Sequence, residues 1–275
     1  MELQERILLA GGAGTGKTYG WLTIARYFSN SKFYVIDPDD GVRRVWYSEF
    51  PEVNNIEYYV TPKWYGKNYE TCKNRPVAVP IKGRQNCYQS GVADAWKLIK
   101  PKLKENDWVI IEHLGTLWDM VQSGFASEIF RENVGEYFLE TRKNLKPGDR
   151  TLDAFKGWTD WPTINKMHND DFIIPVCFEN PAHVLMTSSI SISTSGDKED
   201  IEVKQFYGDT KIRIEGQKRN PFRAQTILLL TRQNRKPPKY MMETFVKDRG
   251  RQWIDTREWS DMALDYLLDV GGWEL

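Results

Sequence analysis

A glycine-rich run near the start of the chain has the residue types and the spacing of a phosphate-binding loop. It reads Gly11-Gly12-Ala13-Gly14-Thr15-Gly16-Lys17-Thr18 and satisfies the pattern G-x-x-x-x-G-K-[ST]. Glycines let the backbone wrap with its N–H groups pointing inward, and the N-terminus of a following helix extends this anion nest. Lys17 is expected to reach the β- and γ-phosphates, and the Thr18 hydroxyl to bind Mg²⁺. The run therefore predicts binding of a nucleoside triphosphate, for which we expect ATP with Mg²⁺.

An acidic residue ends the apolar run Trp108–Glu112, which reads WVIIE. A P-loop enzyme needs a carboxylate at the end of a buried strand to hold the water shell of Mg²⁺. Glu112 is therefore the predicted metal-site acid, together with Thr18. Glutamate is longer than aspartate by a methylene, so we expect it to reach the metal or its water with a slightly altered geometry. The alternative is that Glu112 only ends a strand.

A second acidic run follows the apolar residues Phe33–Ile36 and reads Asp37-Pro38-Asp39-Asp40. The run therefore marks a second predicted strand that ends in acids. Asp-Pro-Asp-Asp-Gly is also favourable turn chemistry, so an acidic turn without a catalytic role stays open. The sequence does not decide which of Asp37, Asp39 and Asp40 would have a catalytic role.

Positive charge is concentrated late in the chain. Lys+Arg and Asp+Glu both total 38, yet residues 204–251 hold six Lys and seven Arg against four acids, a net of +9 that leaves −9 elsewhere. Between Lys204 and Arg223, basic residues are interleaved with the aromatic residues Phe206, Tyr207 and Phe222. This pattern suits single-stranded DNA, because cations track phosphates and rings stack on bases. The alternatives are a solvated basic hairpin and, for Phe206, Tyr207 and Phe222, ordinary core packing.

A pair of cations follows the last apolar run, in the sequence Phe245-Val246-Lys247-Asp248-Arg249. Alternation along a strand places Lys247 and Arg249 on the same face, so both could address one γ-phosphate. The alternative is a basic strand end with no catalytic role.

The elements that must position these residues alternate between apolar runs and helical patterns. Trp21, Ala25 and Phe28 share a helical face just after the P-loop, and Val92, Trp96, Ile99 and Leu103 share another that Pro101 should kink or end. The expected strands are Arg6–Ala10, Phe33–Asp37, Ile56–Thr61, Trp108–Glu112, Ala182–Thr187, Thr226–Thr231 and Tyr240–Lys247. Such alternation predicts an α/β fold whose twisted, mostly parallel sheet is flanked by helices. The last two strands predict a late antiparallel hairpin.

Length and composition fit this fold. The 275 residues, with 13% aromatic and 28% charged side chains, indicate a globular chain with a substantial core. The apolar runs are too short to cross a membrane. The three cysteines are an odd number and far apart, which argues against a disulfide framework. We expect a cytoplasmic protein with a core over residues 1–255, an insertion near 61–90, and an acidic helix or tail over 256–275.

The order of P-loop, helix, VIDPDD, third strand, helix and VIIE resembles the RecA-like P-loop ATPases over residues 5 to 255. In that family the second strand ends in an I-D-x-E motif whose last acid polarises water, which by position implies Asp39, an aspartate in place of glutamate. Ring helicases of the family carry a K-x-R pair that points at the neighbouring subunit's nucleotide, which implies Lys247 and Arg249. The KDR run looks most like compact phage-type ATPases of recombination and single-strand annealing, which would place the protein in the host cytoplasm.

The resemblance implies a DNA-stimulated ATPase that assembles as a ring or filament on single-stranded DNA. Two other functions stay open. One is a P-loop kinase of a nucleotide or other small phosphoacceptor, against which the late hairpin and the lack of a compact arginine lid both argue. The other is a motor or loader in which ATP drives a protein partner in a larger assembly.

Overall fold

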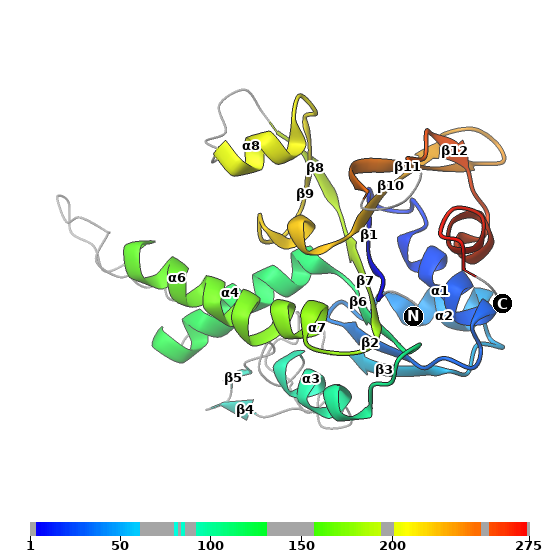
Figure 1. Ribbon diagram of the computed structural model, residues 1–275. Helices are drawn as coiled ribbons and strands as arrows, with labels where there is room; N and C mark the ends of the chain where they lie inside the picture. The colour runs from blue at the N-terminus through cyan, green and yellow to red at the C-terminus, as the bar shows by residue number, and fades with distance from the viewer. Residues whose placement is uncertain are drawn as a thin grey trace.

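The computed structural model describes residues 4–60, 80–81, 84–85, 92–130, 157–193, 201–248 and 253–273 of the chain (Figure 1). Arg249 and most of the insertion expected near 61–90 lie outside the described residues, as do residues 194–200. No helix in the described part of the chain is both long enough and apolar enough to span a membrane.

The centre of the molecule is an eight-stranded sheet with the order β12-β11-β10-β1-β7-β6-β2-β3. Strands β3, β2, β6, β7, β1 and β10 run parallel, and β11 and β12 are antiparallel to their neighbours. The strands are β1 (Arg6–Gly11), β2 (Phe33–Asp37), β3 (Ile56–Val60), β6 (Trp108–Ile111), β7 (His183–Ser188), β10 (Thr226–Gln233), β11 (Lys239–Asp248) and β12 (Arg257–Glu258). The predicted α/β fold with a mostly parallel sheet and a late antiparallel hairpin is confirmed.

Helices cover both faces of this sheet (Figure 1). One face carries α3 (Asp94–Ile99), α4 (Leu114–Phe130), α6 (Gly157–His168) and α7 (Ile174–Phe178), and the other carries α1 (Lys17–Tyr27), α2 (Val42–Glu49) and the π-helix η6 (Ala263–Leu268). The π-turn η4 (Asn169–Ile173) joins α6 to α7. Helix α3 passes into a 3₁₀ turn, η3 (Lys100–Lys102), at Pro101, where the sequence predicted a kink or an end.

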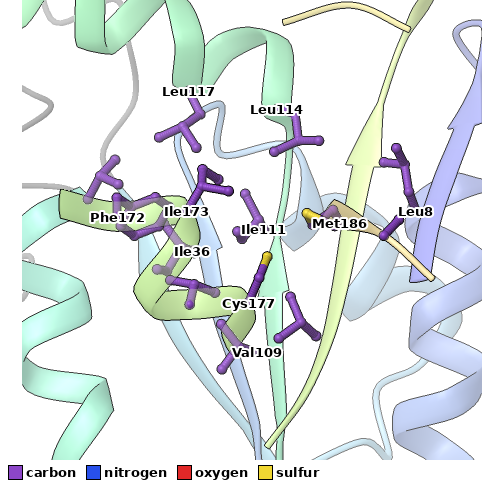
Figure 2. Packing of buried hydrophobic residues seen from close by; sticks show 14 of the residues in the cluster. Leu8, Ile36, Val109, Ile111, Leu114, Leu117, Phe172, Ile173, Cys177 and Met186 are labelled. Atoms are coloured by element: carbon purple, nitrogen blue, oxygen red, sulfur yellow. The ribbon is translucent and has the colours of Figure 1, made fainter. Parts of the chain in front are cut away.

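The core is built from the alternate faces of the parallel strands. Fully buried strands pack on both sides, so their sequences are continuous apolar runs instead of alternating ones. Figure 2 shows one face, where Leu8, Met186 and Ile111 from neighbouring strands meet Ile173 and Cys177 from the helical layer. This packing holds the carboxyl ends of the strands in a fixed row.

Two smaller ladders lie outside the main sheet. Strands β4 (Pro80–Ile81) and β5 (Arg84–Gln85) pair with each other, as do β8 (Ile190–Ile192) and β9 (Ile212–Ile214). Helix α8 (Ile201–Tyr207) precedes β9, and the 3₁₀ turn η5 (Asn220–Arg223) leads into β10.

Residues after 255 also contribute to this architecture. Strand β12 extends the main sheet, and the Thr23 hydroxyl of α1 accepts a 2.9 Å hydrogen bond from the Met262 N–H at the start of η6. Arg26 of α1 also pairs with Asp261 at 2.6 Å. The described residues on both sides of position 255 thus pack on shared elements, and a functional boundary there stays a prediction.

Candidate nucleotide site

The glycine-rich loop joins β1 to α1 at the edge where the parallel strands end. A Cβ on Gly11 would lie 2.4 Å from the Leu230 carbonyl oxygen, so no larger residue fits where β1 turns beside β10. Gly16 has φ +97°, and a Cβ there would lie 2.9 Å from the Trp259 ring. Close packing therefore requires glycine at position 11, and both packing and the positive φ favour glycine at position 16.

Lys17 lies inside this loop. Its Nζ donates to the carbonyl oxygens of Gly11 and Gly12 at 2.7 and 2.8 Å. Burial lowers the pKa of the Lys17 ammonium, while the carboxylates of Glu112 and Glu215 act in the opposite direction. A phosphate oxygen is a stronger acceptor for an ammonium than a carbonyl is, so a bound polyphosphate would draw Lys17 from these carbonyls.

Glu112 follows β6 and faces the first turn of α1. One carboxylate oxygen accepts from the Thr18 hydroxyl at 2.8 Å and the other from the Trp21 indole N–H at 2.9 Å. Burial, followed by the nearby Asp37 carboxylate, raises the pKa of Glu112 to about 7. Two residues from elements 94 positions apart in the sequence are thus held in direct contact.

This contact fits Mg²⁺. The ion prefers hard oxygen ligands and usually keeps several waters, binding proteins through one or two carboxylates together with substrate phosphates. Thr18 and Glu112 offer a hydroxyl and a carboxylate at the base of the loop. Within the described residues, no group of three or more His, Cys, Asp or Glu side chains could hold a metal without such outside ligands. The donor set therefore suits a metal that arrives with a nucleotide.

The three aspartates after β2 differ in their surroundings. Asp37 is fully buried and accepts from the Tyr58 hydroxyl at 2.5 Å and from the Val42 N–H at 3.0 Å. Burial raises the pKa of Asp37, against these hydrogen bonds. Asp40 pairs with Arg43 at 3.0 Å and accepts from Tyr58. Asp39 is exposed and accepts from the Thr116 hydroxyl at 2.8 Å. Of the three, Asp39 is therefore the most accessible to a substrate water.

The end of β7 connects the loop to the β8–β9 ladder. Ser188 pairs with Ala10 of β1 in the sheet, and its hydroxyl donates to the Glu215 carbonyl at 2.8 Å. His113, directly after Glu112, accepts from the Ser189 N–H through Nε2 at 2.6 Å. Residues 188–189 therefore link the nucleotide site to the β8–β9 ladder, whose second strand belongs to the basic region.

Lys247, the described residue of the predicted finger, lies at the opposite edge of the same subunit's sheet. Strand β10 is parallel to β1, with Gly11 beside Leu230, and β11 runs back so that Asp248 lies beside Thr226. Lys247 donates to the Phe222 carbonyl at 2.8 Å. Lys247 is thus far along the sheet from its own P-loop, and the proposed role on a neighbouring subunit stays a prediction.

The aromatic residues of the basic region pack on one another. The Phe206 and Phe222 ring centroids are 4.3 Å apart, and Tyr207 is 5% exposed and packs on Phe206. This packing favours the core interpretation over rings that stack on bases. The cations differ: Lys204, Lys211, Lys218 and Arg219 are exposed, with Arg219 paired to Glu202 at 2.8 Å. The region from Lys204 to Arg223 therefore presents exposed cations, while its aromatic rings pack on one another.

Sequence reasoning missed the residues that hold the predicted ones in place. Trp21, Tyr58 and Thr116 carry neutral donors with no motif of their own, so only the structure shows that they bind the acids. Glu215 lies in a run of basic residues and so gave no signal of its own, although its charge raises the pKa of Lys17. Arg232, beside the P-loop, carried no signal other than belonging to that run.

No protein-family model matches the chain, and no curated protein matches it either. Among solved structures the chain is similar to one titled "Crystal structure of the RadB recombinase". The TM-score is 0.42 at 12% sequence identity, over 93% of this chain and 86% of that one.

Proposed function

We propose that the protein is a RecA-like ATPase that binds ATP with Mg²⁺ and acts on single-stranded DNA in recombination, annealing or replication. The observation that carries the proposal is the meeting of Lys17, Thr18 and Glu112 at the carboxyl edge of the parallel strands. Binding crevices in open α/β sheets lie outside this edge. The loop, the cation and the acid together form a site for a triphosphate and its metal.

Each residue of the site has a defined task. The loop and Lys17 bind and orient the phosphates, and Thr18 and Glu112 would hold Mg²⁺. Bound Mg²⁺ supplies charge neutralisation at the β- and γ-phosphate oxygens. Trp21 fixes the orientation of Glu112 through its second oxygen. Phosphoryl transfer depends mainly on such positioning and electrostatic stabilisation.

Asp39 is the proposed general base. It is exposed at the end of β2, and the Thr116 hydroxyl at the start of α4 orients its carboxylate. Asp37 and Asp40 are held by Tyr58, and Asp37 also fixes the turn before α2. These contacts support Asp39 as the acid that accepts a proton from the attacking water, while its neighbours shape the turn.

Single-stranded DNA is the proposed macromolecular ligand, and a ring or filament the proposed assembly. The exposed cations of residues 204–219 follow the β8 strand, which His113 links to the nucleotide site through Ser189. Binding of a polyanion to this face could therefore be transmitted through Ser189 and His113 to the neighbouring Glu112. The finger pair Lys247 and Arg249 requires a second subunit, because Lys247 lies at the edge opposite its own loop.

The test is ATP hydrolysis with and without single-stranded DNA, together with mass from light scattering. Stimulation by DNA that falls with salt is expected, with a slope of about −0.7 per phosphate contact. Reversing the exposed Lys211 and Lys218 to glutamate should flatten that slope. Lys166, which is exposed and pairs with Asp171 on another part of the molecule, provides the matched control. Transfer of phosphate to a small acceptor would instead indicate a kinase, and hydrolysis indifferent to DNA would favour a protein-driving motor.

A further inference from the structure

A second cation reaches the P-loop from the sheet edge itself. Strand β10 lies beside β1, with Leu230 next to Gly11, and then continues to Gln233. Its burial changes at this point, because residues 226–230 are buried and residues 231–233 are exposed. The last three residues of β10 therefore form a projection beyond the end of its pairing with β1, while they stay paired with β11.

Arg232 is the residue in this projection that meets the loop. A Cβ placed on Gly14 would lie 3.6 Å from Nη1 of Arg232, at ordinary van der Waals distance. Gly14 has φ +70°, so it belongs to the part of the loop whose backbone conformation depends on glycine. The guanidinium thus lies against a loop whose chemistry is anion binding.

The charge of Arg232 is not matched by an acid in the part of the chain that the structure describes. No ion pair or side-chain hydrogen bond joins it to those residues, although nearby cations are paired: Lys239 with Glu258, and Arg257 with Asp269 at 2.8 Å. A guanidinium prefers bidentate oxygen acceptors such as carboxylate or phosphate. At the rim of an anion nest, a bound phosphate is the acceptor that would complete the arrangement.

We propose that Arg232 binds the polyphosphate of the nucleotide held by the P-loop of its own chain. The inference rests on the proposed ATP site and adds a residue that acts within one subunit, in contrast to Lys247 and Arg249. Because Gly14 is in the middle of the loop, Arg232 contributes to binding of nucleoside diphosphates as well as triphosphates. It is a binding residue, and its effect is on affinity in the ground state.

The experiment is equilibrium binding of fluorescent ADP and of a non-hydrolysable ATP analogue to the full chain. Arg232→Ala should weaken both by about tenfold or more, as expected for loss of a charge-assisted hydrogen bond. Arg232→Lys should fall between wild type and Arg232→Ala, since it keeps the charge and loses the fork. Arg235→Ala removes the same charge from the same hairpin and should bind like wild type. Circular dichroism and the melting temperature should match wild type for all three.

The outcomes separate this inference from the proposed function. Wild-type affinity in Arg232→Ala, with binding abolished in Lys17→Ala, overturns the role of Arg232 and leaves the ATP site standing. A wild-type protein that binds no nucleotide overturns both. In mixed assemblies at subsaturating ATP, added Lys17→Ala should not restore the reduced activity of Arg232→Ala, because neither chain contains a complete cradle. Recovery in that mixture would show that Arg232 acts on a neighbouring subunit, contrary to the proposal.

Discussion

The two edges of the central sheet have different chemistry. At the carboxyl ends of the parallel strands lie Lys17, Glu112 and Asp37, in contact with polar donors from several elements. At the opposite edge, His183 and Trp108 pack with Trp273, whose indole N–H donates to Glu5 at 3.4 Å. One edge gathers charged and polar groups of the candidate site, and the other is closed by packed aromatic rings. The difference teaches that strand direction, more than residue type, decides which polar groups serve the site.

The late hairpin shows the same lesson within two strands. Strand β10 ends beside the P-loop and delivers Arg232, whereas β11 begins there and carries Lys247 to the far edge. A cation at the C-terminal end of a strand therefore lies at one edge of the sheet if the strand is parallel to β1, and at the opposite edge if it is antiparallel. Within one subunit, Arg232 therefore lies beside the P-loop that holds Lys17, and Lys247 lies at the far edge.

The largest expected effect compares a lysine at each edge. Lys17→Ala removes the cation inside the loop and should abolish measurable ATP hydrolysis, because a positioned charge on the phosphates is lost. Lys32→Ala removes an exposed lysine near the start of β2, at the opposite edge, and should leave hydrolysis near wild type. Steady-state phosphate release measures both. Equal losses in the two variants would mean that the carboxyl edge holds no special site.

The second prediction tests whether the far edge becomes part of a site in an assembly. Arg249→Ala should bind ATP normally and hydrolyse it about 10³-fold more slowly, as for loss of a finger supplied in trans. An Arg249→Ala chain has an intact loop, and a Lys17→Ala chain has an intact finger. Their mixture should recover activity that neither variant has alone. If co-assembly is confirmed and the mixture stays inactive, Arg249 does not act on a neighbouring subunit's nucleotide.

The fold was largely predictable from the sequence because its signals are local. Continuous apolar runs such as Phe33–Asp37 and Trp108–Ile111 are buried on both faces, and the structure has them as parallel strands. Helix α2 was not expected, although Val42, Val45 and Trp46 recur at helical spacing and pack on one core cluster. Helix α4 was not expected either, although Leu114, Leu117, Val121 and Phe125 are buried at helical spacing. Both helices begin just after an acid that ends a strand, so turn and strand-end signals obscured the helical periodicity that follows.

The candidate site was predictable only where a motif fixes several residues together. The P-loop does so, and Glu112 follows from the apolar run before it. The contacts that hold Glu112 and Asp39 come from Trp21 and Thr116, which approach through packing of α1 and α4. Arg232 depends on which strand neighbours β1, a pairing of residues more than two hundred positions apart in the sequence. Such long-range pairing leaves no local pattern.

The third prediction separates two acids at the carboxyl edge. Asp39→Asn should keep ATP affinity and slow hydrolysis by about 10²–10⁴-fold, because a general base is lost. Glu112→Gln should instead raise the Mg²⁺ concentration needed for half-maximal activity, since one charged metal ligand is lost. Magnesium titrations of nucleotide binding and of hydrolysis distinguish the two. Wild-type turnover in Asp39→Asn would move the general base to another residue, with Asp40 and Glu215 as the next to replace.

The smallest expected effect is a pH dependence of stability with opposite signs at the two edges. At the far edge, burial lowers the pKa of His183 to about 4, and its Nδ1 accepts from the Glu5 N–H at 3.0 Å. An unfolded histidine has a pKa of about 6.5, so the unfolded chain binds the proton more readily. The stability that His183 contributes is complete above about pH 6.5 and is lost as the pH falls toward 4.

Glu112 has the opposite sign, because burial raises its pKa to about 7 in the folded chain. Its contribution to stability is present below the unfolded value near 4.5 and is lost as the pH rises through 7. Denaturant unfolding at pH 5 and pH 7.5 measures both. His183→Gln should reduce the gain in unfolding free energy between these pH values by about 2 kcal/mol, whereas Glu112→Gln should increase that gain. The same sign for both variants would contradict the separate environments of the two edges, because a buried acid and a buried base cannot then be responsible.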